Sequence, residues 1–481
     1  MEPRWPRRTL GVRGGSRLAF AAITAVIAIG VGCGYDSPGT ITSGILRKYQ
    51  RQSGSKPLTA GGMIRIRLVL SRAGIEASGS SELLWEPWRY RETASSGGWT
   101  TTRGIEYGKA FYTDFDGVTR VVSEPVLREL MTRSYFWRRA WLFQNREDAR
   151  TFLGPADDAS VSIRFQPPGA NPLTMSFSRR DGRLLSVRSA RFHLEFSSPT
   201  KFRDLSDPAT PLEGEVGWVG LPTGRLPNPL AGGGRARFPE TPSLVPFERR
   251  GGAIIVAARI AGEPVRLAID AAADGPVLLS PQLAGRLPLT FRMDVYGRYV
   301  AAEASLEVGG VVYPSLFVQR SGDVPAGADA VAGACLFREA VVDLDPETRQ
   351  FGLRDPEKWV IPEGYFRVVI DDDGDVPVAI VDRGKHALRL TAGSDTGEAA
   401  LLLASQSAAR VGLADKVTAK GLMWGAIKLP DLPLQVSDRG FFPDWGDDGR
   451  VGFPLLLRFH VYIHMPSRWI YLRPAGTDVR R

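Results

Sequence analysis

Hydrophobic and polar residues alternate along the first half of the chain. Segments such as "MIRIRLVL", "VSIRFQPPG" and "LTMSFSRR" place an apolar side chain at every second position, which is the pattern of a half-buried β-strand. One helix is expected in "SEPVLRELMTRSYFWRRAWLF", where Ser123 can cap the first turn and Pro125 lies within it. The pattern predicts a β-rich α+β domain over residues 61–220.

Changes in composition mark the segments around this domain. Residues 1–33 combine an Arg-rich start with the apolar run "LAFAAITAVIAIGVG" and end at Cys33. They indicate an export leader, and acylation of Cys33, an uncleaved membrane anchor and a plain signal peptide all remain open. The polar residues 34–60 are expected to be a tether. Six prolines and four glycines in residues 221–246 predict a linker.

The second half of the chain contains an internal repeat, with one copy in residues 247–358 and the other in residues 359–476. Each copy has the order strand, strand, Asp loop, apolar strand, short Ala-rich helix, hairpin region, Gly turn, helix start and closing hairpin. The separation between the Asp loop and the Gly turn is nearly the same in both. The repeat predicts two β domains of one kind.

The repeat resembles the retropepsin-like aspartic peptidases, in which an Asp-Thr-Gly loop packs beside a later hydrophobic-hydrophobic-Gly motif. In the second copy Asp395, Thr396 and Gly397 match the triplet, and Gly452 ends the Gly turn after Arg450 and Val451. The resemblance implies a mostly β fold, in which tandem retropepsin-like acid-protease β-barrel domains form one bilobal unit. It also implies that Thr396 bonds across the lobes and that Gly397 allows a close backbone approach.

The first copy keeps only part of this motif. Asp270 takes the place of the aspartate and Gly333 ends a fitting Gly turn, but Ala271 and Ala272 stand where Thr-Gly is expected. Ala272 would be strained if its φ were positive. An alignment of the copies without gaps pairs Asp270 with Ser394, and one inserted residue would pair it with Asp395.

The resemblance implies a chemistry for the two aspartates. Asp270 and Asp395 would share one proton and activate a water, since two carboxylates in contact cannot both ionise. Two flaps would close on the substrate, and the candidate substrate-binding residues are Tyr296, Gly297, Met423, Trp424 and Gly425. This chemistry needs no metal and no cofactor, and the sequence predicts neither.

The domain over residues 61–220 resembles the lipoprotein-carrier-like domain that precedes such tandem domains in some exported bacterial proteins. The stretch "MTRSYFWRRAWLF" and its neighbouring strands carry this resemblance. The aromatic residues of the domain could line a lipid or peptide groove or form ordinary sheet core; they are Trp85, Trp88, Tyr90, Trp99, Tyr107, Phe111 and Tyr112.

Composition narrows the remaining possibilities. The 481 residues are 43% apolar and 23% charged with a net charge of +9, as in an ordinary globular protein. Because the basic residues are not clustered, no nucleic-acid partner is expected. His460 and His464 are expected on a strand, where residues four apart lie too far apart to share a metal.

Two functions follow from the sequence. The first is an exported aspartic endopeptidase that hydrolyses polypeptides through Asp270 and Asp395. The second is a catalytically inactive pseudo-peptidase that acts as a membrane-tethered peptide- or lipid-binding module in the cell envelope, facing the periplasm or the exterior. Either would be monomeric, since both lobes are on one chain.

Overall fold

The computed structural model describes residues 38–476 apart from 56–61, 73–74, 87–88, 97–98, 107, 115, 207–210, 221–235, 242–243, 274–276, 294–299, 372–373 and 439–445. Cys33, the rest of the leader and most of the predicted linker lie outside the described residues. The predicted mostly β fold is confirmed, because strands make up most of the regular structure. No described helix is long and apolar enough to cross a membrane.

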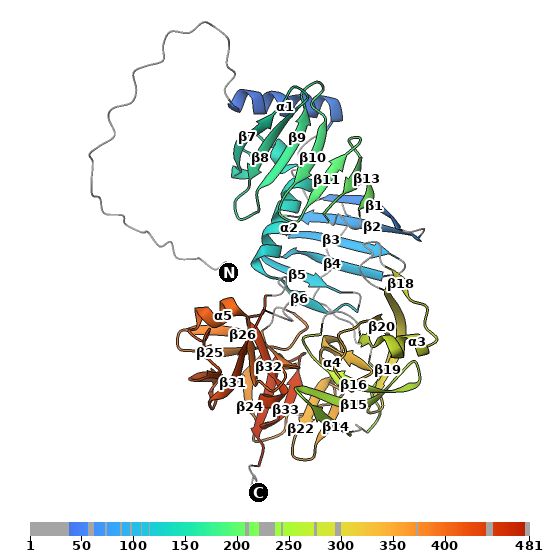
Figure 1. The fold of residues 1–481 in the computed structure, drawn as a ribbon, viewed down its shortest axis with the longest axis vertical. Helices are drawn as coiled ribbons and strands as arrows, with labels where there is room; N and C mark the ends of the chain where they lie inside the picture. The colour runs from blue at the N-terminus through green and yellow to red at the C-terminus, as the bar shows by residue number, and fades with distance from the viewer. Residues whose placement is uncertain are drawn as a thin grey trace, which may run out of the picture.

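An antiparallel sheet of 13 strands forms the N-terminal part, which we call the half-barrel (Figure 1). Its order is β6-β5-β4-β3-β2-β1-β13-β12-β11-β10-β9-β8-β7, so two meanders meet where β1 pairs with β13. The strands are β1 (Gly62–Arg72), β2 (Ile75–Glu86), β3 (Arg89–Ser96), β4 (Trp99–Glu106), β5 (Lys109–Thr113), β6 (Thr119–Val121), β7 (Arg150–Ala156), β8 (Ser160–Gln166), β9 (Leu173–Ser178), β10 (Leu184–Arg188), β11 (His193–Phe196), β12 (Lys201–Asp204) and β13 (Leu212–Gly220).

Two helices pack on the half-barrel. Helix α2 (Glu124–Trp137) lies where the sequence predicts a helix, but it is shorter than the predicted segment. It ends at Trp137 because Arg139 has a φ of 57°, which is incompatible with a right-handed helix. The short 3-10 helices η1 (Ala140–Leu142) and η2 (Arg146–Asp148) connect α2 to β7.

The predicted tether is wrong over most of its length, because residues Pro38–Ser53 form helix α1. Ile45, Leu46 and Tyr49 are buried in the core of the half-barrel, which fixes this helix in place. Figure 1 shows α1 lying across the strands β7 to β10, at the end of the half-barrel away from the repeat.

The repeat forms two further sheets, which we call the tandem unit. A 13-stranded sheet contains β14 (Leu244–Arg250), β15 (Ala253–Ile260), β16 (Glu263–Ile269), β17 (Val277–Leu279), β18 (Arg292–Met293), β19 (Val300–Val308), β20 (Val311–Arg320), β21 (Ala330–Ala332), β22 (Val341–Asp345), β23 (Gln350–Arg354), β24 (Phe366–Val369), β33 (Phe459–His464) and β34 (Trp469–Pro474). An eight-stranded sheet contains β25 (Val378–Arg383), β26 (His386–Ser394), β27 (Leu401–Leu403), β28 (Thr418–Ala419), β29 (Leu422–Trp424), β30 (Ile427–Lys428), β31 (Leu432–Val436) and β32 (Gly449–Gly452). The helices are α3 (Pro281–Arg286), α4 (Ala334–Glu339), α5 (Ser405–Arg410) and α6 (Phe453–Leu456).

The two copies have the same strand pairing. In the first, β15 and β16 form a hairpin, β16 runs parallel to β21, β21 is antiparallel to β17, and β17 is parallel to β20. In the second, β25, β26, β32, β27 and β31 repeat each of these relations in the same order. The strand before each Asp loop therefore lies beside the strand that ends at the Gly turn.

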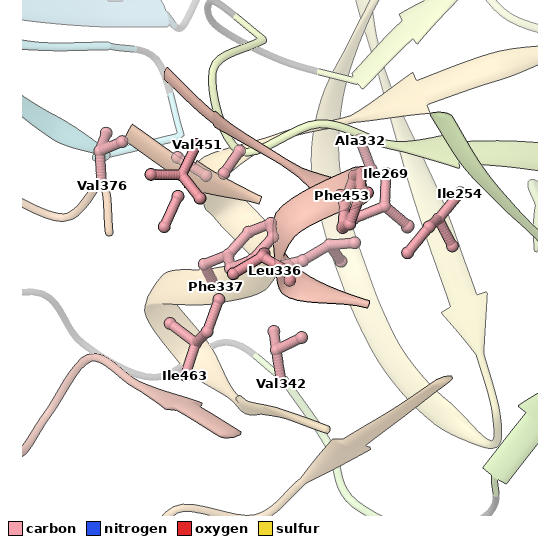
Figure 2. Packing of buried hydrophobic residues seen from close by; sticks show 14 of the residues in the cluster. Ile254, Ile269, Ala332, Leu336, Phe337, Val342, Val376, Val451, Phe453 and Ile463 are labelled. Atoms are coloured by element: carbon pink, nitrogen blue, oxygen red, sulfur yellow. The ribbon is translucent and has the colours of Figure 1, made fainter. Parts of the chain in front are cut away.

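One core joins the two copies. Figure 2 shows side chains of both copies in this core, among them Phe337 of α4, Val451 of β32 and Ile463 of β33. The closing hairpins also pair directly, because β22 is antiparallel to β33. Across this seam His460 Nε2 lies 2.9 Å from Asp343 Oδ1.

Candidate functional site

Each Asp loop closes a turn on its own backbone. The amide of Ala272 donates a 2.9 Å hydrogen bond to Asp270 Oδ1, and the amide of Gly397 donates a 2.9 Å bond to Asp395 Oδ1. Gly397 has a φ of 64°, whereas Ala272 is not among the residues with positive φ. The strain considered for Ala272 is therefore absent.

The two aspartates follow their strands in different register. Ile269 pairs with Ala332 and is followed at once by Asp270. Ala392 pairs with Val451 at the matching place, but a bulge at Gly393, whose φ is 89°, and then Ser394 come before Asp395. Asp395 thus lies two residues further along its strand than Asp270 does.

Glycines 333 and 452 occur where the sequence placed them, at the starts of α4 and α6. A Cβ on Gly333 would lie 2.8 Å from Ala273 O, and one on Gly452 would lie 1.8 Å from Thr396 Oγ1. Both positions therefore exclude a side chain, because the Asp loop passes against the turn.

Thr396 does not make the bond that the resemblance implied. Its hydroxyl donates to Ala399 O at 2.6 Å, within its own loop. The contact between the two loops is made by backbone, since the amide of Ala271 donates to Gly393 O at 2.9 Å. Ala271 needs no hydroxyl for this bond, which explains how the first loop keeps its place without threonine.

Charges of both signs surround Asp270. Burial raises the pKa of Asp270, Arg450 and the amide of Ala272 oppose the rise, and the charge of Asp395 adds to it. The hydroxyl of Ser394 is buried and lowers the pKa of Asp270 slightly, although it has no well-formed hydrogen bond among the described residues. The site is an asymmetric cluster, because the positive charge of Arg450 opposes the effect of the Asp395 charge on the pKa of Asp270.

A hairpin of the half-barrel occupies the space beside this cluster. The end of β5, the turn after it and β6 reach into the tandem unit, where Val118 joins the core of the tandem unit. Arg120 donates a 2.7 Å bond to Ala273 O in the Asp270 loop. Thr119 and Asp375 are bonded twice, from Thr119 N to Asp375 Oδ2 at 2.8 Å and from Asp375 N to Thr119 O at 2.7 Å.

The same hairpin contacts both copies, so we call residues 114–121 the joint. Asp116 Oδ1 accepts a 2.9 Å bond from Phe317 N, and Asp116 O accepts a 2.8 Å bond from Arg338. Gly446 N donates to Val121 O at 3.3 Å in the second copy. The joint fixes the half-barrel against the tandem unit, and through Arg120 it is bonded to the Asp270 loop.

Replacing Asp116 by alanine is expected to loosen the joint. The amide of Phe317 would lose its acceptor in the protein interior, at a cost of about 1–3 kcal/mol. Thermal unfolding should occur at lower temperature, with the tandem unit and the half-barrel separating into two transitions. Asp181→Ala, in an exposed turn, is the control, and an equal effect of both substitutions would contradict the role of the joint.

A small cavity lies next to the joint. It measures about 20 Å³ and is lined by Arg120, Val121, Asp371, Gly374, Val376, Val378, Arg389 and Asp447, which is room for a water molecule and no more. Burial raises the pKa of Asp447, and a hydrogen bond from Thr391 opposes this rise. The cavity is too small for a peptide.

The second predicted flap does not form an open cover. Tyr296 and Gly297 lie outside the described residues. Trp424 is fully buried and belongs to the core of the tandem unit, Met423 is half-buried, and a Cβ on Gly425 would touch Val368 at 3.1 Å. The β29–β30 hairpin therefore packs on the body of the protein.

The sequence missed a second candidate site, the interior of the half-barrel beneath α1. Phe165, Phe177 and Met175 are fully buried there. Trp141 of η1 contacts Tyr49 of α1 with ring centroids 5.0 Å apart, and it also contacts Phe165 and Phe177. The signal in the sequence was the spacing of the apolar residues Ile45, Leu46 and Tyr49, which fits one face of a helix.

A buried ion cluster holds α2 on the sheet. Glu92 of β3 accepts bonds from Arg133 of α2 at 2.5 Å, from Arg103 of β4 at 2.7 Å and from the Tyr90 hydroxyl at 2.6 Å. Burial tends to raise the pKa of Glu92, but Arg103 and Arg133 outweigh it and lower the pKa to about 2. Glu92 therefore carries its charge throughout the ordinary pH range.

No metal site is apparent in the described part of the chain, where no three His, Cys, Asp or Glu side chains are grouped as ligands. His460 and His464 lie on β33, as expected. Ser467 bonds to His464 Nδ1 at 2.8 Å and Asp343 to His460 Nε2, so each histidine has its own partner.

Comparisons with known proteins add solved structures only, because no family model and no curated protein matches the chain. A DUF1329 family protein from Desulfovibrio piger is 9% identical, with 38% of this chain and 92% of that chain covered and a TM-score of 0.26. A LolA superfamily protein from Nitrosomonas europaea is 7% identical, with 39% and 94% covered and a TM-score of 0.24. A putative outer membrane lipoprotein-sorting protein domain from Vibrio parahaemolyticus is 8% identical, with 37% and 93% covered and a TM-score of 0.25.

The comparisons do not support the peptidase resemblance. No family model or curated protein supports a peptidase, and the three solved structures named above are a DUF1329 family protein, a LolA superfamily protein and a putative lipoprotein-sorting protein domain. The identification of the chain as an aspartic peptidase, and with it as a hydrolase, was therefore wrong. The physical reason lies in the site, where the two aspartates differ in register, the charge of Arg450 lowers the pKa of Asp270, and Arg120 of the joint is bonded to the Asp270 loop.

Proposed function

We propose that this protein is a non-catalytic module of the cell envelope whose half-barrel binds an acyl chain of a lipid or lipoprotein. The observation that carries the proposal is the buried aromatic core beneath α1. An acyl chain is bound by apolar surface at about 0.8 kcal/mol for each buried CH₂, and rings of Phe, Tyr and Trp supply large surfaces of this kind.

The helix that covers this interior is attached by side-chain contacts and is not part of the sheet. Ile45, Leu46 and Tyr49 are its buried apolar residues, and each contributes roughly 1.5–3 kcal/mol. Lys48 Nζ donates to Arg179 O at 3.2 Å, at the exposed surface. A ligand that replaced these contacts could enter without unfolding the sheet, because the sheet is held by its own ladders.

The tandem unit would have a supporting role. The tandem unit grips the half-barrel through the joint, and the Asp270 cluster would be a structural remnant that holds the two copies together. The leader in residues 1–33 would bring the protein to the envelope, where lipids and lipoproteins are found.

The proposal is tested with the full chain after removal of bound lipid. A dansyl-labelled C11 fatty acid should bind saturably at one site per molecule. A diazirine-labelled fatty acid should then crosslink to peptides that contain Tyr49, Trp141 or Phe177. Tyr49→Asp should weaken binding at least tenfold, since it puts a carboxylate in the apolar interior, whereas Tyr365→Asp in the tandem unit should not.

Two outcomes would contradict the proposal. One is the absence of saturable binding, or crosslinks confined to residues of the tandem unit. The other is cleavage of denatured casein, between acidic and neutral pH, that is lost in Asp395→Asn; such cleavage would show that the protein is an enzyme.

A further inference from the structure

The connection between α2 and β7 is strained. Arg139, Arg146, Glu147 and Asp148 have φ values of 57°, 50°, 49° and 61°. Left-handed backbone costs a residue with a side chain roughly 1–2 kcal/mol, and such strain persists only where neighbouring contacts impose it. Four of the seven non-glycine residues with positive φ in the described chain lie in these ten positions, so the strain is concentrated here.

Backbone hydrogen bonds, core packing and polar side-chain contacts hold the strained segment in place. Arg138 Nη2 and Glu147 Oε2 form an ion pair at 2.6 Å, with 27% and 36% of the two side chains exposed. The Tyr135 hydroxyl donates to Arg146 O at 3.2 Å, and Asn145 accepts a bond from Glu147 N at 3.2 Å. The Arg138–Glu147 pair ties the two ends of the segment together.

The segment carries one closing group of the aromatic interior. Trp141 is 1% exposed and contacts the Tyr49 ring of α1 at a tilt of 54°, whereas residues 144 and 145 are exposed. Trp141 Nε1 donates to Phe136 O at 3.3 Å, which is the one hydrogen bond of its side chain that the described structure shows. Displacing the segment would withdraw Trp141 from Tyr49 and expose Phe165 and Phe177.

We propose that residues 138–149 form a strained gate, which opens at the contact between Trp141 and Tyr49 and admits an acyl chain to the half-barrel. The inference rests on the proposed function and names the entrance of its site. Opening releases the left-handed residues into ordinary backbone and offsets part of the cost of exposing Trp141. The Arg138–Glu147 pair is the latch that keeps the gate closed without ligand.

Relief of the strain and removal of the Arg138–Glu147 latch should have opposite effects on the rate at which the protein takes up the dansyl fatty acid. Asp148→Gly accepts a positive φ without a penalty, which stabilises the closed gate, and uptake should slow about two- to fivefold after allowance for the greater freedom of glycine when open. Arg138→Ala removes the latch, and uptake should accelerate about two- to fivefold, as for a partly exposed ion pair. Both rates are read by stopped-flow fluorescence.

A matched control separates strain from general stability. Arg349 also has a positive φ, 54°, but lies in the β22–β23 turn of the tandem unit. Arg349→Gly relieves the same kind of strain at a distance, so it should leave uptake unchanged. A slowing by Arg349→Gly equal to that by Asp148→Gly would overturn the gate.

Hydrogen exchange of the amides in residues 139–149, measured without ligand, tests the motion of the gate separately from the binding of the fatty acid. Exchange should be slower in Asp148→Gly and faster in Arg138→Ala, with α2 unchanged. If exchange follows this order but no variant binds the fatty acid, the proposed function fails and the gate motion stands. If the fatty acid binds while exchange and uptake are the same in all variants, the gate is overturned.

Discussion

Glu92→Gln is expected to destabilise the half-barrel by about 3–5 kcal/mol, the usual cost of removing one partner from a buried ion pair. Glutamine keeps the shape of the side chain but leaves Arg133 with an uncompensated charge under α2. Arg133 also lies over the Phe192 ring at 4.7 Å, and only 14% of its side chain is exposed, so water would compensate its charge poorly. Denaturant unfolding followed by circular dichroism measures the change.

The pH dependence of this effect has a definite sign. The pKa of Glu92 falls from 4.5 to about 2 on folding. The ionised form therefore contributes stability that is fully present above pH 4.5 and is lost as the pH falls towards 2, by roughly 3 kcal/mol. The difference between wild type and Glu92→Gln should shrink over that window and stay constant from pH 5 to 7.

Glu82→Gln is the matched control for this prediction. Glu82 lies on the neighbouring strand and pairs with Arg65 at 2.5 Å, but 33% of Glu82 and 52% of Arg65 are exposed. A surface pair of this kind contributes about 0.2–1 kcal/mol. Similar losses in the two variants would show that burial is not what makes the Glu92 cluster strong.

The strand order of the repeat could be predicted from the sequence because it depends on local pattern. Apolar strands such as β17 and β27 and the glycines at positions 333 and 452 recur in the same order, and each recurrence predicts the same pairing. The bulge at Gly393 could not be predicted, since an apolar pattern does not show how many residues lie between a strand and its loop. This bulge decides that Asp270 and Asp395 are in different register.

Contacts between segments that are distant in the sequence could not be predicted either. Asp116-Gly117 has the composition of an exposed turn, yet Asp116 is buried against Phe317, 201 residues away. Burial of this turn depends on the shape of the tandem unit, and no local pattern contains that shape. The positive φ values at Arg146 and Glu147 were equally hard to predict, because Arg and Glu do not favour positive φ.

Helix α1 was missed for a different reason. Residues 34–60 are polar on average, and their composition predicted a tether. Position was more informative than composition, since Ile45, Leu46 and Tyr49 share one helical face and that face is the buried one.

Gly252→Ala is expected to destabilise the tandem unit by about 3 kcal/mol, at the upper end of the cost of overpacking. A Cβ at this position would lie 2.2 Å from Gly397 O and 2.4 Å from Asp395 Oδ1. The first distance is to backbone, which cannot rotate away as a side chain can. The β14–β15 turn would have to move off the Asp395 loop, and the exposed Arg249–Glu398 pair at 2.7 Å would separate with it.

Two other glycines make this prediction specific to the contact. Gly251 has a φ of 58° and nothing within 4 Å of a Cβ, so Gly251→Ala should cost about 1–2 kcal/mol through strain alone. Gly285, in α3, has neither positive φ nor a neighbour, and Gly285→Ala should be neutral or stabilising by up to about 1 kcal/mol. Urea unfolding should rank the losses as Gly252, then Gly251, then Gly285. If Gly252→Ala cost no more than Gly251→Ala, the close approach of the first copy to the Asp395 loop would not hold the copies together.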